Sequence, residues 1–267
     1  MLGVTLLPWQ RQVAEVALEQ DDGRPAFRDV LVATPRQSGK STLLLALLVW
    51  RLLAAEGQRI VYGAQSRLAS RQKLIDDWWP MVAKSPVGDM FKLSKAMGME
   101  ALRCSNGSLM TLVSTESSSG HGQSLDLAVL DECWSMSAAQ EQAVRPAMVT
   151  RPGAQLWMTS TAGDVRSVWW RSRVEAARER VEAGSTRGVA YFEWSAGAEV
   201  DVTDPVTWAS FMPALGHTID ERTVADDAEA MDLNEFRRAY ANQWIDELDL
   251  AGWELISEAD WRRAIGG

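Results

Sequence analysis

A glycine, a lysine and a serine at residues 39–41 are typical of a loop that binds phosphate. The triplet lies between an apolar run at residues 30–33 and a second apolar run at residues 43–53. This order predicts a strand, a tight turn and a helix, whose backbone N–H groups would face one anion. We therefore expect Lys40 to reach the β- and γ-phosphates of a nucleotide and the Ser41 hydroxyl to bind Mg²⁺.

The loop departs from the general pattern at one position. A glycine is usual five residues before Gly39, and this chain has Thr34 there. A chance triplet in a surface turn is the alternative, and the flanking apolar runs disfavour it. Arg36 could place its guanidinium on phosphate oxygens or form a salt bridge that shapes the loop. The residues expected to bind nucleotide are Pro35, Arg36, Gln37, Ser38, Gly39, Lys40, Ser41 and Thr42, with Gln10 upstream.

Two adjacent carboxylates, Asp131 and Glu132, end an apolar run at residues 125–130. Beside a phosphate-binding loop, Asp131 would hold the Mg²⁺ hydration shell opposite Ser41. Glu132 would deprotonate the water that attacks the γ-phosphate. Asp is also a good helix N-cap, so a capping pair is the alternative. The apolar residues directly before the pair favour the catalytic interpretation.

Short hydroxyl side chains end the next apolar run, at residues 155–158. Thr159, Ser160 and Thr161 could contact the γ-phosphate or the attacking water and report its loss, and an ordinary polar turn is the alternative. Further upstream, Gln10 follows a Pro-Trp pair. It could bind the adenine edge because its amide both donates and accepts hydrogen bonds.

The elements that must position these residues alternate along the chain. We expect strands at residues 30–33, 59–64, 125–130, 155–158 and 189–194, and helices at 11–19, 67–84, 165–183, most of 220–244 and from the phosphate loop to about 55. An Asn-Gly turn predicts a hairpin within residues 101–113. Because strands alternate with helices, the sequence predicts an α/β fold with a mostly parallel sheet and sites at the strands' carboxyl ends.

Composition excludes some classes of protein. A net charge of −9 argues against a surface covered with basic residues for nucleic acid, and a local basic stripe stays open. The arginines of residues 166–180 are interleaved with glutamates, which favours a salt-bridged face over a DNA contact. No segment is apolar and long enough to cross a membrane, and no secretory signal is predicted. Cys104 and Cys133 are expected to be buried free thiols.

Five motifs together resemble the large terminase subunit of tailed bacteriophages, the ATPase motor that packages DNA into procapsids. In chain order they are Leu7-Pro8-Trp9-Gln10, the loop Pro35-Arg36-Gln37-Ser38-Gly39-Lys40-Ser41, Val129-Leu130-Asp131-Glu132, Thr159-Ser160-Thr161 and Asn242-Gln243-Trp244. The arginine in the phosphate loop is the most specific feature. By position, the resemblance implies that Arg36 is the phosphate-loop arginine, Glu132 the catalytic carboxylate and Thr159 to Thr161 the coupling motif.

The resemblance also implies an architecture. We expect a RecA-like, additional-strand (ASCE) P-loop NTPase core at residues 1–163, with helices flanking the sheet. A small lid subdomain would follow at 164–250 and a linker at 251–267. ATP and Mg²⁺ are the expected ligands, with Glu132, Arg36 and Lys40 as catalytic residues.

The partners that the resemblance implies are those of a packaging motor. They are double-stranded DNA, the portal protein, the small terminase subunit and further copies of the chain in a ring of five subunits on the procapsid, in the host cytoplasm and away from membranes. Full-length relatives continue into an RNase H-like nuclease. We expect no nuclease activity here, because the sequence ends where that domain would begin.

A second departure concerns an arginine that many relatives carry just before the acidic strand, where it is proposed to act on the neighbouring subunit's ATP. Residues 114–125 contain no arginine, so Arg103, Arg145 and Arg151 are the candidates for this role. Such a residue can raise the rate by about 10³-fold or more. Its source therefore affects how active a single subunit would be.

Two other functions are compatible with a phosphate loop and an acidic pair. A superfamily 2 helicase would need a second RecA-like domain, for which this sequence has no room. A nucleotide-binding assembly module would need no turnover, and the intact Lys40, Asp131 and Glu132 disfavour it.

Overall fold

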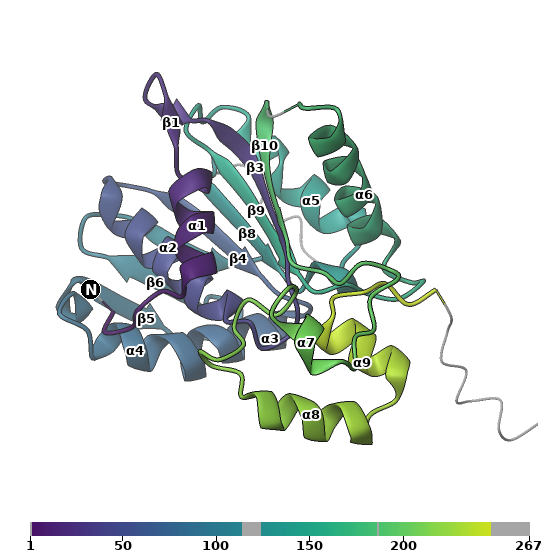
Figure 1. Ribbon diagram of the computed structural model, residues 1–267. Coiled ribbons are helices and arrows are strands. Elements are labelled where there is room, and N and C mark those ends of the chain that lie inside the picture. The colour runs from purple at the N-terminus through teal and green to yellow at the C-terminus, as the bar shows by residue number, and fades with distance from the viewer. Residues whose placement is uncertain (1, 114–123, 186, 247–267) are drawn as a thin grey trace, which may run out of the picture.

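An eight-stranded sheet forms the centre of the computed structural model, which describes residues 2–113, 124–185 and 187–246 (Figure 1). Its strand order is β10-β3-β9-β8-β4-β7-β6-β5. The strands from β10 to β7 are parallel, and β6 and β5 run antiparallel at one edge. The strands are β3 (Phe27–Ala33), β4 (Arg59–Gly63), β5 (Phe91–Ser94), β6 (Ala101–Cys104), β7 (Leu109–Leu112), β8 (Leu127–Asp131), β9 (Gln155–Ser160) and β10 (Gly188–Glu193).

Helices cover both faces of this sheet (Figure 1). They are α1 (Pro8–Ala17), α2 (Lys40–Ala54), α3 (Arg67–Gln72), the π-helical η1 (Lys73–Trp78), α4 (Trp79–Ala83), α5 (Ala138–Val144) and α6 (Val168–Glu182). Helices α7 (Pro205–Trp208), α8 (Glu221–Ala230) and α9 (Leu233–Tyr240) lie below the sheet in Figure 1. None of these described helices is long and apolar enough to cross a bilayer.

The sheet has an apolar layer on each face because the side chains of each strand point alternately to the two faces. In β3, Val30 and Val32 pack with α1 and α2, whereas Leu31 and Ala33 pack with α5 and α6. Successive side chains of a strand point to opposite faces, so a run of apolar residues is buried on both sides. The predicted α/β class with a mostly parallel sheet is confirmed.

Most predicted elements are confirmed, with differences in detail. The predicted helix at 67–84 is divided by the π-helical turn η1. The predicted hairpin is β6–β7, and both cysteines are buried and free. The short hairpin β1 (Gln20–Asp21) and β2 (Arg24–Pro25), the edge strand β5 and helix α5 were not expected.

A separate small core lies beside the sheet, below it in Figure 1. It begins at Ala196, ends at Ala241 and contains Trp208, Phe211 and Phe236. The predicted boundary at residue 163 would place α6 and β10 outside the main core. The structure contradicts that division, because β10 pairs with β3 along its whole length and α6 packs on the sheet. We propose residue 196 as the start of the appended subdomain; the linker expected at 251–267 lies outside the described residues.

Candidate functional site

A cleft of about 510 Å³ lies at the carboxyl ends of β3, β4 and β8. Both the phosphate loop and the acidic pair line this cleft. The lining residues are Arg36, Gln37, Ser38, Gly39, Lys40, Ser41, Tyr62, Ala64, Gln65, Ala69, Lys73, Asp131, Glu132 and Trp134. The structure thus brings together the loop and the two carboxylates that the sequence analysis singled out.

Backbone geometry and internal hydrogen bonds shape the phosphate loop. Gly39 has a φ of 93°, in the left-handed region that favours glycine, and α2 begins directly after it. The Ser38 hydroxyl donates to the Pro35 carbonyl over 2.9 Å, and the Lys40 ammonium donates to the same carbonyl over 3.3 Å. Pro35 therefore serves the loop through its backbone, and Thr42 lies in the first turn of α2, outside the cleft lining. Lys40 lines the cleft, where a phosphate could replace that carbonyl as its partner.

Gln10 lies beneath the phosphate loop and is only 1% exposed. Its Nε2 donates to the Gly39 carbonyl over 2.8 Å, and its Oε1 accepts the Leu7 N–H over 2.7 Å. A Cβ on Gly39 would lie 2.7 Å from the Gln10 Nε2, so the contact requires glycine there. The amide is bonded within the protein and does not line the cleft, and its contact with an adenine edge stays a prediction. Gln10 supports the loop, as does Trp9, whose indole donates to the Ser38 carbonyl.

Asp131 is buried at the end of β8 and accepts three hydrogen bonds. Its Oδ1 accepts from the Thr159 hydroxyl over 2.7 Å and from the Glu132 N–H over 3.0 Å, and its Oδ2 accepts from the Tyr62 hydroxyl over 3.2 Å. Burial, reinforced by the neighbouring charge of Glu132, raises the pKa of Asp131. A cation bound beside Asp131 would relieve this unfavourable burial of charge.

Replacing Asp131 with Asn should therefore stabilise the protein without ligand, by about 1 kcal/mol at neutral pH. An Asp pKa that is raised on folding lowers stability as the pH rises above the unfolded value of about 3.9. The advantage of Asp131→Asn should thus be largest near neutrality and shrink as the pH falls and Asp131 takes up a proton. Urea denaturation between pH 5 and about pH 8 measures it, with the exposed Asp76→Asn as control. Lower stability of Asp131→Asn at neutral pH would contradict this account.

Glu132 adopts a backbone conformation that is rare for its residue type. Its φ of 57° and ψ of 46° lie in the left-handed region, which costs a non-glycine residue about 1 kcal/mol and is concentrated at functional sites. The carboxylate is held at the cleft by Trp134, whose indole N–H donates to Glu132 Oε2 over 2.8 Å. Trp134 was not among the predicted site residues, and its only sequence signal is its position two residues after Glu132.

Thr159, Ser160 and Thr161 lie behind the acidic pair and do not line the cleft. Thr159 bonds Asp131, and the Ser160 hydroxyl accepts the backbone N–H of Trp134 over 2.9 Å. These hydroxyls therefore contact the groups around the cleft, and a direct contact with a γ-phosphate stays a prediction. The Thr161 hydroxyl donates to the Arg238 carbonyl over 3.2 Å, which connects the end of β9 to α9.

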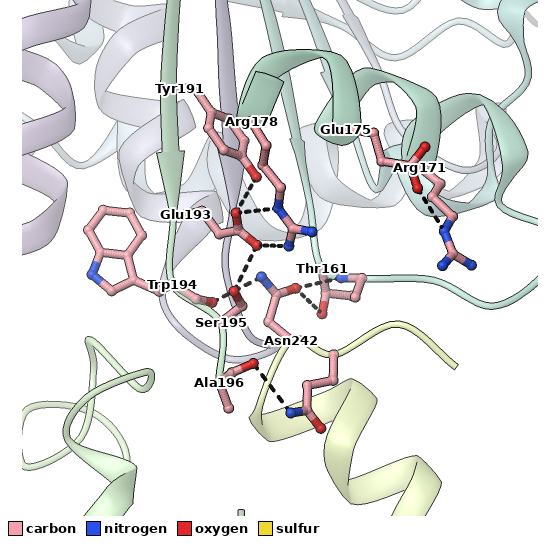
Figure 2. Close-up of polar contacts among 12 residues, drawn as sticks. Thr161, Arg171, Glu175, Arg178, Tyr191, Glu193, Trp194, Ser195, Ala196 and Asn242 are labelled. Atoms are coloured by element: carbon pink, nitrogen blue, oxygen red, sulfur yellow. Dashed lines mark hydrogen bonds and ion pairs between the residues drawn. The ribbon is translucent and has the colours of Figure 1, made fainter. Parts of the chain in front are cut away.

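Asn242 joins the ends of two strands to the appended subdomain (Figure 2). Its Oδ1 accepts the Ala162 N–H over 2.5 Å and faces the Thr161 hydroxyl at 3.3 Å, and its Nδ2 donates to the Trp194 carbonyl over 2.9 Å. A φ of 53°, directly after α9, suits asparagine better than most residues. We refer to these bonds of Asn242 as the Asn242 clamp.

A second cleft, of about 760 Å³, lies between β10, α6 and the chain after α9. Two of its charged residues pair with each other: the Arg178 guanidinium pairs with the Glu193 carboxylate, which also accepts from the Tyr191 and Ser195 hydroxyls (Figure 2). This cleft is larger in volume than the first, and most of its charged groups are already paired.

Arg171 and Arg173 of α6, and Arg166 just before it, also pair with carboxylates, which supports the salt-bridged interpretation of this segment. Ion pairs join Arg166 to Asp164, Arg171 to Glu175 and Asp246, and Arg173 to Glu141.

The three candidate arginines for a neighbour's site lie away from this cleft. Arg145 forms a two-pronged contact with Asp29, with both distances at 3.1 Å, near the amino end of β3. Arg151 lies 3.6 Å from a carboxylate oxygen of Asp126, just before β8. Arg103 is exposed on β6. Arg145 and Arg151 thus lie at the edge of the sheet opposite to the cleft and already have carboxylate partners.

The cleft offers oxygen ligands that suit a magnesium ion. The Ser41 hydroxyl and the Asp131 carboxylate both line it. Residues 2–113, 124–185 and 187–246 contain no group of three His, Cys, Asp or Glu side chains that could hold a metal. Mg²⁺ typically takes one or two protein oxygens and completes its shell with water and phosphate, so the residues present fit it.

Comparisons with known proteins identify relatives of the whole arrangement. The family model for the N-terminal part of the terminase large subunit, T4likevirus-type, matches residues 31–188. No curated protein matches the chain. The large terminase of bacteriophage HK97 has a TM-score of 0.74 at 22% identity, covering 90% of this chain and 51% of that one.

Two further solved structures are similar. The large terminase ATPase domain of Thermus phage P74-26 has a TM-score of 0.58 at 14% identity and covers 90% of this chain and 100% of that one. A large terminase from another thermophilic bacteriophage, in complex with ATP-gamma-S, has a TM-score of 0.63 at 11% identity, with coverages of 90% and 53%. The chain spans about half the length of this protein and of the HK97 protein, and the likeness confirms the predicted RecA-like fold.

Proposed function

Because the chain belongs to the terminase large subunit family, within its N-terminal part, we propose that it is an ATPase that hydrolyses ATP in the cleft between β3, β4 and β8. The observation that carries this proposal is the convergence of Lys40, Asp131 and Glu132 on one cleft. One of the similar large terminases, from a thermophilic bacteriophage, was solved with ADP and with ATP-gamma-S, which supports a nucleotide as the ligand.

The reaction assigns a role to each group. Glu132 takes a proton from a water molecule whose oxygen attacks the γ-phosphorus. The bond from that phosphorus to the bridging oxygen breaks, and ADP leaves with the electron pair. Lys40 and Arg36 balance the negative charge on the phosphate oxygens. Mg²⁺, held by Ser41 and through water by Asp131, would neutralise charge on the β- and γ-phosphates.

Hydrogen bonds connect this chemistry to the appended subdomain. Trp134 contacts Glu132 through its indole and Ser160 through its backbone. Thr161, next along the chain, bonds α9 and Asn242. A change at the γ-phosphate that moves Glu132 would therefore act on α9 through Thr159 to Thr161. The subdomain would act as a lid whose position follows the nucleotide.

Membership of this family supports the proposal that ATP hydrolysis by this chain drives DNA packaging. In this proposal the moved substrate is double-stranded DNA, and the motor is a ring of five copies on the procapsid. The portal protein and the small terminase subunit are its partners, and it works in the host cytoplasm. This chain supplies the ATPase part of that motor.

Removing the Lys40 ammonium tests the proposal at its first step. Lys40→Ala should weaken Mg²⁺–ATP-gamma-S binding by about tenfold or more, because a charge-assisted hydrogen bond is lost. Calorimetry on the whole chain measures this affinity, with the exposed Lys92→Ala on β5 as the control. Wild-type protein that binds no nucleotide, or equal affinities for Lys40→Ala and Lys92→Ala, would contradict the proposal.

A further inference from the structure

Two arginines from distant parts of the sequence lie in or beside the cleft. Arg36 belongs to the phosphate loop and lines the cleft. Its backbone N–H donates to the Ala239 carbonyl over 2.8 Å, so the last turn of α9 lies on the loop. Arg238, one residue earlier on α9, places its guanidinium carbon 5.9 Å from the centre of the Trp134 ring. Trp134 lines the same cleft and bonds Glu132.

Neither guanidinium has a carboxylate partner among the residues that the structure describes. Asp164 is the acid whose charge acts most strongly on Arg238, and it is already bonded to Arg166. Partial burial, followed by the charge of Arg36, lowers the pKa of Arg238. Two like charges held together in a partly buried place are unfavourable until an anion joins them.

The position of this pair defines the anion. Arg36 lies in the loop that would hold the phosphates, and Arg238 lies beside the tryptophan that holds the proposed general base. The group between a phosphate loop and its general base is the γ-phosphate of a bound nucleoside triphosphate. Its oxygens carry the charge that two planar guanidinium groups bind well.

We propose that Arg238 is a catalytic residue supplied by α9 of the same chain, and that Arg238 and Arg36 together bind the γ-phosphate oxygens of ATP. This inference rests on the proposed ATPase function. As water adds to the γ-phosphorus and the bond to the bridging oxygen of ADP breaks, the two guanidinium groups stabilise the charge on the γ-phosphate. Because Arg238 belongs to the appended subdomain, nucleoside triphosphate would also draw α9 onto the loop, and ADP would not.

The competing explanation is that Arg238 only packs on the Trp134 ring. The two explanations predict different effects of an Arg238 substitution on the affinities for nucleotides with and without a γ-phosphate. Arg238→Gln should weaken ATP-gamma-S binding by about tenfold or more and leave ADP affinity within about twofold. The turnover number should fall by at least the same factor. Arg237→Gln is the matched control, because Arg237 is the adjacent residue on α9 and lines the other cleft.

Calorimetry with ADP and with ATP-gamma-S, both with Mg²⁺, measures these affinities on the whole chain, and circular dichroism checks folding. Arg238→Lys keeps the positive charge but loses the planar N–H donors of the guanidinium, so it should show an intermediate loss of ATP-gamma-S affinity. It replaces Arg238→Gln as the test variant if Arg238→Gln fails to fold. Equal losses for ADP and ATP-gamma-S, or Arg238 variants that match Arg237→Gln, would overturn the inference and leave the ATPase proposal standing. Wild-type protein that binds neither nucleotide would overturn both.

Discussion

Replacing Glu132 with Gln should lower ATP turnover by about 10³-fold and leave ATP-gamma-S affinity within about threefold of wild type. The two side chains have nearly the same shape, and the Gln Oε1 can still accept the Trp134 indole N–H. The substitution therefore removes the proton acceptor without releasing the residue from its position. Single-turnover phosphate release measures the chemical step, and calorimetry measures binding.

The matched control for this substitution is Glu229→Gln, an exposed carboxylate on α8. It should leave turnover unchanged. Glu132→Gln protein that keeps its turnover would mean that Glu132 is not the base. A wild-type rate equal to that of Glu132→Gln, with nucleotide bound, would favour the assembly module that binds without hydrolysis. A large loss of ATP-gamma-S affinity would instead indicate that Glu132 holds the ligand.

The meeting of the phosphate loop and the acidic pair could be predicted from the sequence. Residues 30–33 and 125–130 are almost entirely apolar, which is typical of strands buried on both faces. The carboxyl ends of parallel strands lie at one edge of a sheet, so the residues that follow two such runs must be close. Lys40 and Asp131 both line the cleft for this reason.

The parts of the site that come from long-range packing could not be predicted. Gln10 and Gly39 are far apart in sequence, and no local pattern shows that the amide lies under the loop instead of in the cleft. Arg238 lies close to the site because α9 lies on the phosphate loop through Ala239. Hydrophobic patterns and residue propensities predict single helices and strands, whereas these contacts depend on how distant parts of the chain pack together.

The predicted domain boundary at residue 163 differs from the structure for a related reason. The rise in charge after residue 163 comes from the exposed face of α6, whose other face buries Trp169, Trp170 and Val174 against the sheet. A helix that carries charge on one face still belongs to the core. The strand that follows it, β10, extends the parallel sheet through an ordinary strand–helix–strand crossover. A sequence argument based on the order of elements, in place of charge, would have kept both in the core.

Loss of the Asn242 clamp should destabilise the protein by about 3 kcal/mol, since Asn242→Ala leaves the buried Ala162 N–H and the partly buried Trp194 carbonyl without these partners. Alanine is also disfavoured at a φ of 53°. Asn242→Gly accepts that conformation and should be destabilised by about 1 kcal/mol less than Asn242→Ala, which separates the backbone effect from the hydrogen bonds. Urea denaturation measures both, with Asn234→Ala on α9 as control.

The clamp also makes a prediction about coupling, because it holds the end of the Thr159–Thr161 segment against α9. If that contact transmits the state of the γ-phosphate, hydrogen exchange in α9 should differ between the ADP and ATP-gamma-S complexes of the wild type. The difference should be lost in Asn242→Gly at a temperature where the variant is fully folded. A variant that is less stable but keeps the full nucleotide-dependent difference would show that Asn242 only supports the fold. Coupling would then have to pass through the contact between Arg36 and Ala239 instead.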